Sequence, residues 1–285
     1  LSKYYRDIIK TNYENLKDLL SPIIFTVTSF DINRKEVKKP WLRVPKGTIL
    51  IPNKIYIKKN KIKKIITITS TLSNKESENT KINKSISRLN ETEKSSEKYF
   101  HSMIEKAVKK ITQKNLSKMV ISRQKVLDSD FNAKAQANFL LQAETNFPNC
   151  INFIYDFQDR GIFFGVTPET LFKIKGEELY SEALAGTFKS SSIKSLKDSK
   201  ELDEHNFVVA YLKEIISEIS DDVKWIQKPE LIHLNEMAHL KTKFTSKIKK
   251  DINPFKVLYQ LHPTPAVCGT PKNTAMNEIR QLEEH

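Results

Sequence analysis

The sequence predicts an α+β domain in which sheets and helices form separate layers. A long stripe of apolar residues at helical spacing runs through residues 198–220, and a second helical stripe begins near residue 97. Several short apolar runs with strand character stand beside these helices. Long helices next to non-alternating strands, without an internal repeat, are typical of a layered α+β domain.

The organisation along the chain indicates a β-rich beginning and a larger second part. At 285 residues with 39% hydrophobic content, the chain can form one large domain or two small ones. Residues 1–70 contain the strand-like runs 23–27 and 65–69. Residues 71–96 are rich in Ser, Asn, Thr, Lys and Glu, which predicts an exposed loop or linker. Residues 97–285 form the predicted catalytic region.

The first half of this region begins with a helix and a strand. Ser95 or Ser96 can cap a helix that extends to about Ile111, and a strand is predicted at about 118–127. A second helix, 133–147, ends at Pro148. The remaining predicted elements are paired strands at 150–157 and 161–166, strands at 171–175 and 179–185, the helix at 198–220 and a last helix at 271–284.

Composition argues against several classes of protein. The net charge of +14 permits nucleic-acid binding, but the lysines are dispersed and few aromatic residues lie among them, so we expect a solvated basic face and no nucleic-acid partner. No apolar run approaches the ~20 residues that span a bilayer, so we expect a cytoplasmic protein without membrane contact. Two cysteines without metal-ligand spacing indicate reduced thiols. We expect a monomer.

Glu201 and Glu204 are the first candidates for chemistry. They lie three positions apart on the predicted long helix, so their carboxylates project from one face. Two such oxygen ligands suit Mg2+, which often takes only one or two protein carboxylates. From spacing alone, a solvated helix face beside Lys197 and Lys200 is the favoured interpretation.

Lys118 and Glu169 are candidates for proton transfer. Lys118 opens a predicted strand, and a lysine accepts a proton only when burial or a nearby cation favours its neutral form. Glu169 follows Pro168, which stiffens the turn after an apolar strand. From the residues alone, we would interpret Lys118 as a solubilising charge and Glu169 as an ordinary turn glutamate.

Six segments, taken in order, resemble the active-site motifs of the chorismate-utilising enzymes, and among these most closely the isochorismate synthases. The resemblance covers residues 95 to 285. The segments are Lys-Met-Val-Ile-Ser-Arg at 118–123, Phe-Gly-Val-Thr-Pro-Glu at 164–169, Ala-Leu-Ala-Gly-Thr at 183–187, Lys-Glu-Leu-Asp-Glu-His at 200–205, His-Leu-Lys-Thr at 239–242 and Leu-His-Pro-Thr-Pro-Ala-Val-Cys-Gly at 261–269.

The resemblance implies a fold of large antiparallel sheets flanked by helices and a Mg2+-dependent conversion of chorismate to isochorismate. In similar enzymes a lysine matching Lys118 activates the water that attacks C2, and a glutamate matching Glu169 protonates the C4 hydroxyl as it leaves. Glu204 matches a glutamate that binds Mg2+ on the ring carboxylate, with Glu201 as a secondary acid. Ammonia-using relatives such as anthranilate synthase typically lack the lysine, so Lys118 favours water as the nucleophile.

The resemblance also implies where the substrate binds. It assigns the turn of Ala185, Gly186 and Thr187 to the substrate, with His239 near the ring carboxylate. Ala266 and Val267 would form small apolar walls of the pocket. Aminodeoxychorismate synthases place a nucleophilic lysine at the position of Ala185, which disfavours covalent lysine catalysis here.

Two alternatives stay open at the level of sequence. A salicylate synthase uses the same site and then eliminates pyruvate. The family's final catalytic segment, with a second metal-binding glutamate, has no counterpart before His285, so we expect a C-terminally incomplete fold. A catalytically silent, truncated homologue is therefore the other alternative. An active enzyme of this kind would serve menaquinone or siderophore biosynthesis.

Overall fold

The computed structural model separates the chain into two compact units, Leu1–Asn83 and Lys84–His285. The predicted linker at 71–96 lies outside the described residues, and the division at that stretch stays a prediction. The described residues are 25–34, 44, 46–50, 54–59, 62–67, 97–113, 116–125, 131–157, 160–189, 199–234 and 236–283.

The described part of the first unit consists of two antiparallel strand pairs. Strand β1 (Phe25–Thr28) pairs with β2 (Gly47–Leu50), and β3 (Lys54–Lys59) pairs with β4 (Ile62–Thr67). β1 and β4 overlap the two strand-like runs that the sequence predicted.

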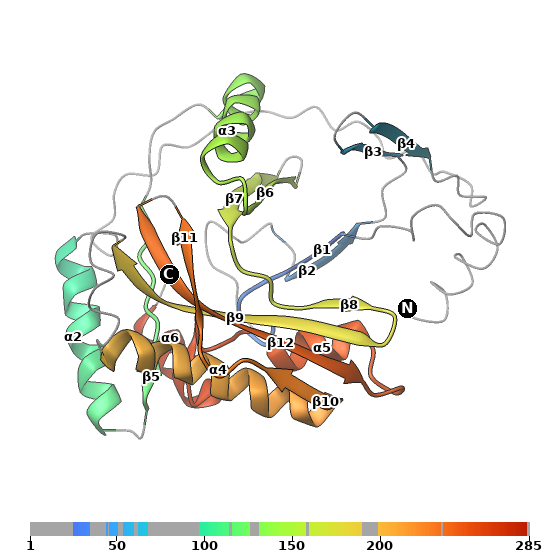
Figure 1. The fold of residues 1–285 in the computed structure, drawn as a ribbon. Helices are drawn as coiled ribbons and strands as arrows, with labels where there is room; N and C mark the ends of the chain where they lie inside the picture. Colours follow the sequence, from blue (N-terminus) through green and yellow to red (C-terminus); the bar gives the residue numbers. More distant parts are fainter. Residues whose placement is uncertain are drawn as a thin grey trace. The chain divides into compact units, whose positions relative to one another are not determined.

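The second unit is built on a five-stranded antiparallel sheet (Figure 1). Its order is β10 (Ser220–Trp225), β12 (Met237–Ile248), β9 (Glu178–Lys189) and β8 (Lys173–Lys175), and β11 (Glu230–Leu234) also pairs with β12. β12 is long enough to pair with β11 along its first half and with β10 along its second half. The predicted α+β class, with antiparallel sheets and helices, is confirmed.

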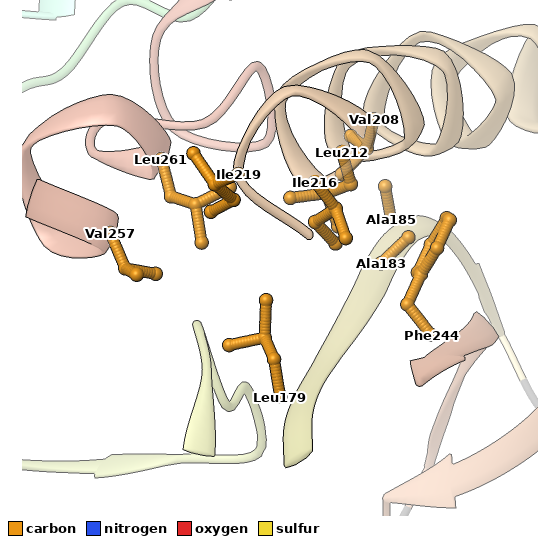
Figure 2. Close-up of a cluster of buried hydrophobic side chains, with 10 residues drawn as sticks. All are labelled: Leu179, Ala183, Ala185, Val208, Leu212, Ile216, Ile219, Phe244, Val257 and Leu261. Atoms are coloured by element: carbon orange, nitrogen blue, oxygen red, sulfur yellow. The ribbon is translucent and has the colours of Figure 1, made fainter. Parts of the chain in front are cut away.

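Helix α4 (Ser199–Ile219) covers one face of this sheet. Residues in β9 and β12 alternate between buried and more exposed positions, and the buried set faces α4. Each Leu or Ile that is fully buried in such a core contributes roughly 1.5–3 kcal/mol. Figure 2 shows the cluster, which contains Leu179, Ala183, Ala185, Val208, Leu212, Ile216, Ile219, Phe244, Val257 and Leu261.

A bulge at Gly186 brings the start of α4 close to the sheet. His239 pairs with Thr187 and Leu240 pairs with Ala185, so Gly186 is the extra residue on β9. Gly186 has a φ of +77°, and a Cβ there would lie 2.7 Å from the backbone oxygen of Glu201. Both the left-handed backbone and the close approach of α4 therefore require glycine.

A second core cluster joins the two ends of the unit. Helix α2 (Glu97–Gln113) contacts α6 (Lys272–Leu282), and β5 (Lys118–Met119) pairs with β13 (Gly269–Thr270) between them. Lys110 of α2 forms an ion pair with the buried Glu278 of α6. The buried residues of the cluster are Leu116, Cys268, Ala275, Met276 and Ile279.

An antiparallel hairpin carries the third part of the unit. β6 (Ile151–Asp156) pairs with β7 (Ile162–Thr167), as the sequence predicted, and α3 (Ala133–Asn146) contacts β6. Phe164 of β7 stacks on Phe131 with ring centroids 4.1 Å apart. This packing fixes the end of β7, which leads directly to Glu169.

Two sequence expectations need correction. The predicted strand at 118–127 is wrong beyond Met119, since only Lys118 and Met119 are in a strand and residues 120–125 are irregular. Beyond Met119 the register leads to Cys268 and the residues before it, and residues 265–268 form turns that offer no extended partner strand. Helix α5 (Pro254–Leu261) was not predicted, although Asn253 accepts a hydrogen bond from the Lys256 amide as an N-cap and Pro254 opens the first turn.

Gly186→Ala is expected to destabilise the protein by about 2–4 kcal/mol, because the new Cβ meets the Glu201 backbone in a left-handed conformation. Gly176→Ala is the matched control: Gly176 has a φ of +63° but open space around its Cβ position, so a loss of only about 1 kcal/mol is expected. Urea denaturation measures both. Equal losses would contradict the role of the helix contact.

Candidate active site

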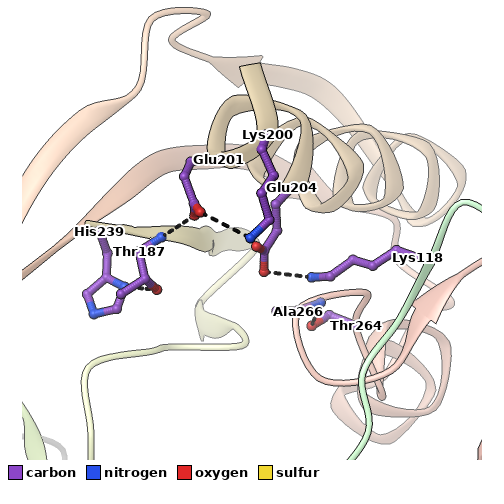
Figure 3. A network of polar contacts seen from close by, with 8 residues as sticks. All are labelled: Lys118, Thr187, Lys200, Glu201, Glu204, His239, Thr264 and Ala266. Atoms are coloured by element: carbon purple, nitrogen blue, oxygen red, sulfur yellow. Dashed lines mark hydrogen bonds and ion pairs between the residues drawn. The ribbon is translucent and has the colours of Figure 1, made fainter. Parts of the chain in front are cut away.

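Lys118 lies in β5 and reaches the N-terminal half of α4. Its Nζ is 3.0 Å from Oε1 of Glu204, and its side chain is only 12% exposed (Figure 3). Gly269 of β13 lies against the Lys118 backbone, because a Cβ at Gly269 would be 2.2 Å from the Lys118 oxygen. The glycine that ends the 261–269 motif therefore permits the pairing that positions Lys118.

The two carboxylates of α4 have different partners. Glu204 contacts Lys118, whereas Oε2 of Glu201 accepts a hydrogen bond of 2.7 Å from the Thr187 amide. The other oxygen of Glu201 is 3.7 Å from the exposed Lys200. Figure 3 shows the two carboxylates directed to separate neighbours. Glu204 is thus beside the lysine, and Glu201 ties α4 to the turn at Thr187.

The turn of Ala185, Gly186 and Thr187 lies where β9 passes the start of α4. The Ala185 side chain is part of the core beneath α4, so only its backbone is available to a ligand. The Thr187 hydroxyl is 3.1 Å from Nδ1 of His239 on the neighbouring strand β12. Burial lowers the pKa of His239, and a hydrogen bond with the Gly186 backbone acts in the opposite direction. The structure brings His239 to the turn with which the sequence grouped it.

Glu169 follows the end of β7 and is half-buried. Its amide donates to the Thr167 hydroxyl at 3.3 Å, which forms a tight turn around Pro168. Burial raises the pKa of Glu169 to about 7, the positive charge of Lys118 opposes the rise, and the negative charge of Glu182 adds to it. A carboxylic acid with this pKa holds its proton in a large part of the molecules at neutral pH, as a general acid must.

The 261–269 segment forms a compact loop beside Lys118. The Ala266 amide donates to the Thr264 hydroxyl at 3.3 Å, and the Thr264 carbonyl accepts from the amides of Val267 and Cys268. Ala266 packs on the core beneath α4, while Val267 is 46% exposed. Figure 3 shows Thr264 and Ala266 next to Lys118. The loop could therefore present a small apolar wall to a ligand held by Lys118 and Glu204.

Sequence reasoning missed the ion pair between Glu182 and Lys241. Nζ of Lys241 is 2.5 Å from Oε2 of Glu182, and both side chains are less than a quarter exposed, at 15% and 22%. They come from adjacent strands and project from the face of the sheet opposite α4. A period-2 reading of β9 would have indicated this orientation, since Glu182 lies between the buried Ser181 and Ala183.

Two residues within the motif segments serve the packing of α4. His205 is 1% exposed, and its Nε2 is 2.8 Å from the hydroxyl of Thr242 in β12. Burial lowers the pKa of His205, while the Ala185 backbone raises it. This contact of the buried imidazole with Thr242 joins helix to sheet, so the histidine next to Glu204 fixes the rotation of the helix.

Among the described residues, no group of three or more His, Cys, Asp or Glu side chains is arranged to hold a metal ion. Glu204 is 35% exposed and is the carboxylate best placed to offer an oxygen, with Glu201 one turn away. Such a set fits Mg2+ that completes its shell with water and substrate oxygens. It does not fit zinc, which in structural sites takes four nitrogen or sulfur ligands.

The profile of a family described as "Chorismate binding enzyme" matches residues 1–285. The chain belongs to this family. Isochorismate synthase EntC of Escherichia coli K12 is 29% identical over 194 residues, which cover 65% of this chain and 49% of EntC. Isochorismate synthase MenF of Bacillus subtilis is 27% identical over 192 residues, covering 63% and 40%. The chain thus spans about half or less of the length of these relatives.

The fold of this chain is also found in solved structures. A crystal structure of a putative 2,3-dihydroxybenzoate-specific isochorismate synthase, DhbC from Bacillus anthracis, superposes with a TM-score of 0.56 at 24% identity. The superposition covers 66% of this chain and 54% of DhbC. No helix in the described part of the family member combines the length and apolar character that crossing a membrane requires.

Glu169 is expected to make stability depend on pH. Its pKa is raised from 4.5 to about 7 by folding, so the unfolded chain ionises first and the stabilisation present below pH 4.5 is lost as the pH rises through about 7. Gln does not ionise, so the unfolding free energy of wild type should fall relative to that of Glu169→Gln between pH 4.5 and about 7 and level off above it.

Urea denaturation at four pH values between 4 and 8 measures this difference. Glu144→Gln, at the exposed Glu144 of α3, is the control for removing a carboxylate from the surface of the same unit. A difference between wild type and Glu169→Gln that stays constant from pH 4 to 8 would show that Glu169 is not perturbed.

Proposed function

We propose that this chain forms the chorismate-binding part of an isochorismate synthase. The observation that carries the proposal is the contact between Lys118 and Glu204 at 3.0 Å, with Glu169 close enough to Lys118 for their charges to interact. A base, an acid and a metal-binding carboxylate are the three groups that exchange of a hydroxyl between two ring carbons needs. The isochorismate synthase names of the relatives support the same reaction.

Lys118 and Glu169 would divide the two proton transfers. Lys118, after its ammonium form has lost a proton, would take a proton from water, whose oxygen forms the new bond to C2 of chorismate. The ring double bonds shift, and the C4–O bond breaks as Glu169 delivers its proton, so that the hydroxyl leaves as water. The pKa of Glu169 near 7 suits this role, because an acid of that strength is protonated yet still able to release its proton.

Glu204, assisted by Glu201, would hold Mg2+. When bound, Mg2+ would neutralise the ring carboxylate of chorismate and orient the ring. Glu204 faces two competing cations in this arrangement, the metal and the ammonium of Lys118. Mg2+ on Glu204 would compete with Lys118 for the carboxylate, and a weaker ion pair would favour the neutral amine that a base requires.

The substrate would lie between the loop and the turn. Ala266 and Val267 would form an apolar wall, and the backbone of Ala185 and Gly186 with the side chains of Thr187 and His239 would contact the polar end. These assignments are supported by the placement of Thr187 beside His239 and by the position of the loop at Lys118. Menaquinone or siderophore biosynthesis would use the product.

Product analysis tests the function. Chorismate and Mg2+ incubated with the full chain are expected to give an isochorismate peak by chromatography, and Lys118→Met is expected to lower its rate by about 10²–10⁴-fold, the usual contribution of a general base. Lys200→Met is the control for loss of a lysine near Glu201. Salicylate with pyruvate would instead indicate a salicylate synthase, and no turnover would favour a silent homologue.

Metal affinity tests the competition between Lys118 and the metal without any turnover. Mn2+ titration, followed by the electron paramagnetic resonance of the free ion, should show about fivefold tighter binding in Lys118→Met, since the ion no longer displaces an ammonium worth about 1 kcal/mol. Glu204→Gln should weaken Mn2+ binding at least tenfold. If Glu204→Gln bound Mn2+ as the wild type does, the metal would lie elsewhere.

A further inference from the structure

Lys272 occupies an unusual position for a lysine. It is the first residue of α6 and is half-buried, and its Nζ donates three hydrogen bonds to uncharged oxygens. The acceptors are the His262 carbonyl at 2.8 Å, the Tyr211 hydroxyl at 3.1 Å and the Gln260 carbonyl at 3.2 Å. All three donors of the ammonium are therefore used. Burial lowers the pKa of Lys272, so the charge is kept at this place against a desolvation cost.

Tyr211 completes the same junction from α4. Its hydroxyl donates to the carbonyls of Gln260 and Leu261, at 2.7 and 3.2 Å. These carbonyls belong to the C-terminal turn of α5, where helices leave backbone oxygens unsatisfied and favour positive charge. We call Lys272 and Tyr211 the anchor. It joins α4, the end of α5, the start of the loop at His262 and the start of α6.

The anchor closes the loop at both ends. His262 begins the loop and Lys272 follows it, and the hydrogen bond between them bridges the two ends. Between these ends, Pro263 and Pro265 restrict the backbone, and the Cys268 carbonyl accepts from the Val120 amide at 2.8 Å. The loop is thus held at the anchor on one side and along the β5 segment on the other.

Helix α4 links the anchor to the candidate metal ligand. Glu204 and Tyr211 are seven positions apart, so they lie on one face of α4 about 10 Å apart along its axis. The loop is fixed to this helix at Tyr211, and it reaches Lys118 beside Glu204. A shift of the loop at the anchor would therefore change the distance from Ala266 and Val267 to Glu204.

We propose that Lys272 is a positioning residue for chorismate: with Tyr211 it holds the 262–268 loop at a set distance from α4 and so places the apolar wall of Ala266 and Val267 opposite Glu204. This inference rests on the proposed function. Lys272 itself does not contact the reacting atoms; it acts through the loop. Displacements of about 1 Å at a distance from the chemistry can cost ~100-fold in rate, so a partial loosening should cost about tenfold.

The test compares Lys272→Met, which keeps most of the length of the side chain but removes all three donors, with Lys272→Arg, which keeps a charged donor. Lys272→Met should raise the KM for chorismate about tenfold with a smaller change in kcat, and Lys272→Arg should recover most of the loss. Tyr211→Phe should act in the same direction. Lys256→Met, at an exposed lysine of the adjoining helix α5, is the matched control and should behave as wild type.

Amide hydrogen exchange of residues 262–268 gives a readout that does not need turnover, and it should rise in Lys272→Met and not in Lys256→Met. Measurements are made well below the melting temperature of each variant. If the wild type is active and Lys272→Met has the same KM, the inference is overturned but the proposed function is not. This holds even if hydrogen exchange rises, because the anchor would then have only a structural role. A wild type that neither binds nor converts chorismate overturns the proposed function and the inference together.

Discussion

The packing of α4 on β9 and β12 is the constraint on which the rest of the second unit depends. This one helix carries Glu201 and Glu204 in its first half and Tyr211 further along the same face, so its rotation and height above the sheet set the position of all three. Gly186 sets the height, because only a glycine leaves room for the Glu201 backbone. The buried contact of His205 with Thr242 sets the rotation. A substitution at Gly186 or at His205 would therefore displace the carboxylates of Glu201 and Glu204 without altering those two residues.

The charged residues of the site alternate in sign, and partial burial strengthens the interactions between neighbouring charges. Glu204 contacts Lys118, and the charge of Lys118 acts on Glu169. The charge of Glu182, which forms an ion pair with Lys241, also acts on Glu169. In a partly buried setting these interactions are screened less than on the surface. Glu169 experiences both neighbours and the loss of water, and the loss of water has the largest effect. An acid and a base can therefore coexist near each other with different protonation states.

Elements with strong local signals were predictable from sequence, and elements that depend on tertiary pairing were not. The helical stripe of α4, the end of α3 before Pro148 and the hairpin β6–β7 agree with the structure within a few residues. The strand expected at 118–127 fails because its length is set by its partner β13, which is distant in sequence and only two residues long. In the site, motif order grouped Lys118 with Glu204, which are in contact in the structure. It could not reveal the ion pair of Glu182 with Lys241, whose residues come from adjacent strands. The register between β9 and β12 decides that contact, and the sequence of neither strand alone determines the register.

A resemblance in motifs does not separate residues that perform chemistry from residues that position it, and the geometry does. In the segment 200–205, Glu204 is accessible and faces a lysine, whereas His205, its neighbour, is buried against the sheet. In the segment 261–269, Ala266 lies near Lys118, whereas Gly269 allows the close approach of the Lys118 backbone. Lys272 lies outside every motif, yet it holds the loop by three hydrogen bonds. A binding site of this kind is specified by the groups that a ligand would touch and, to the same degree, by the contacts that keep those groups at fixed separations.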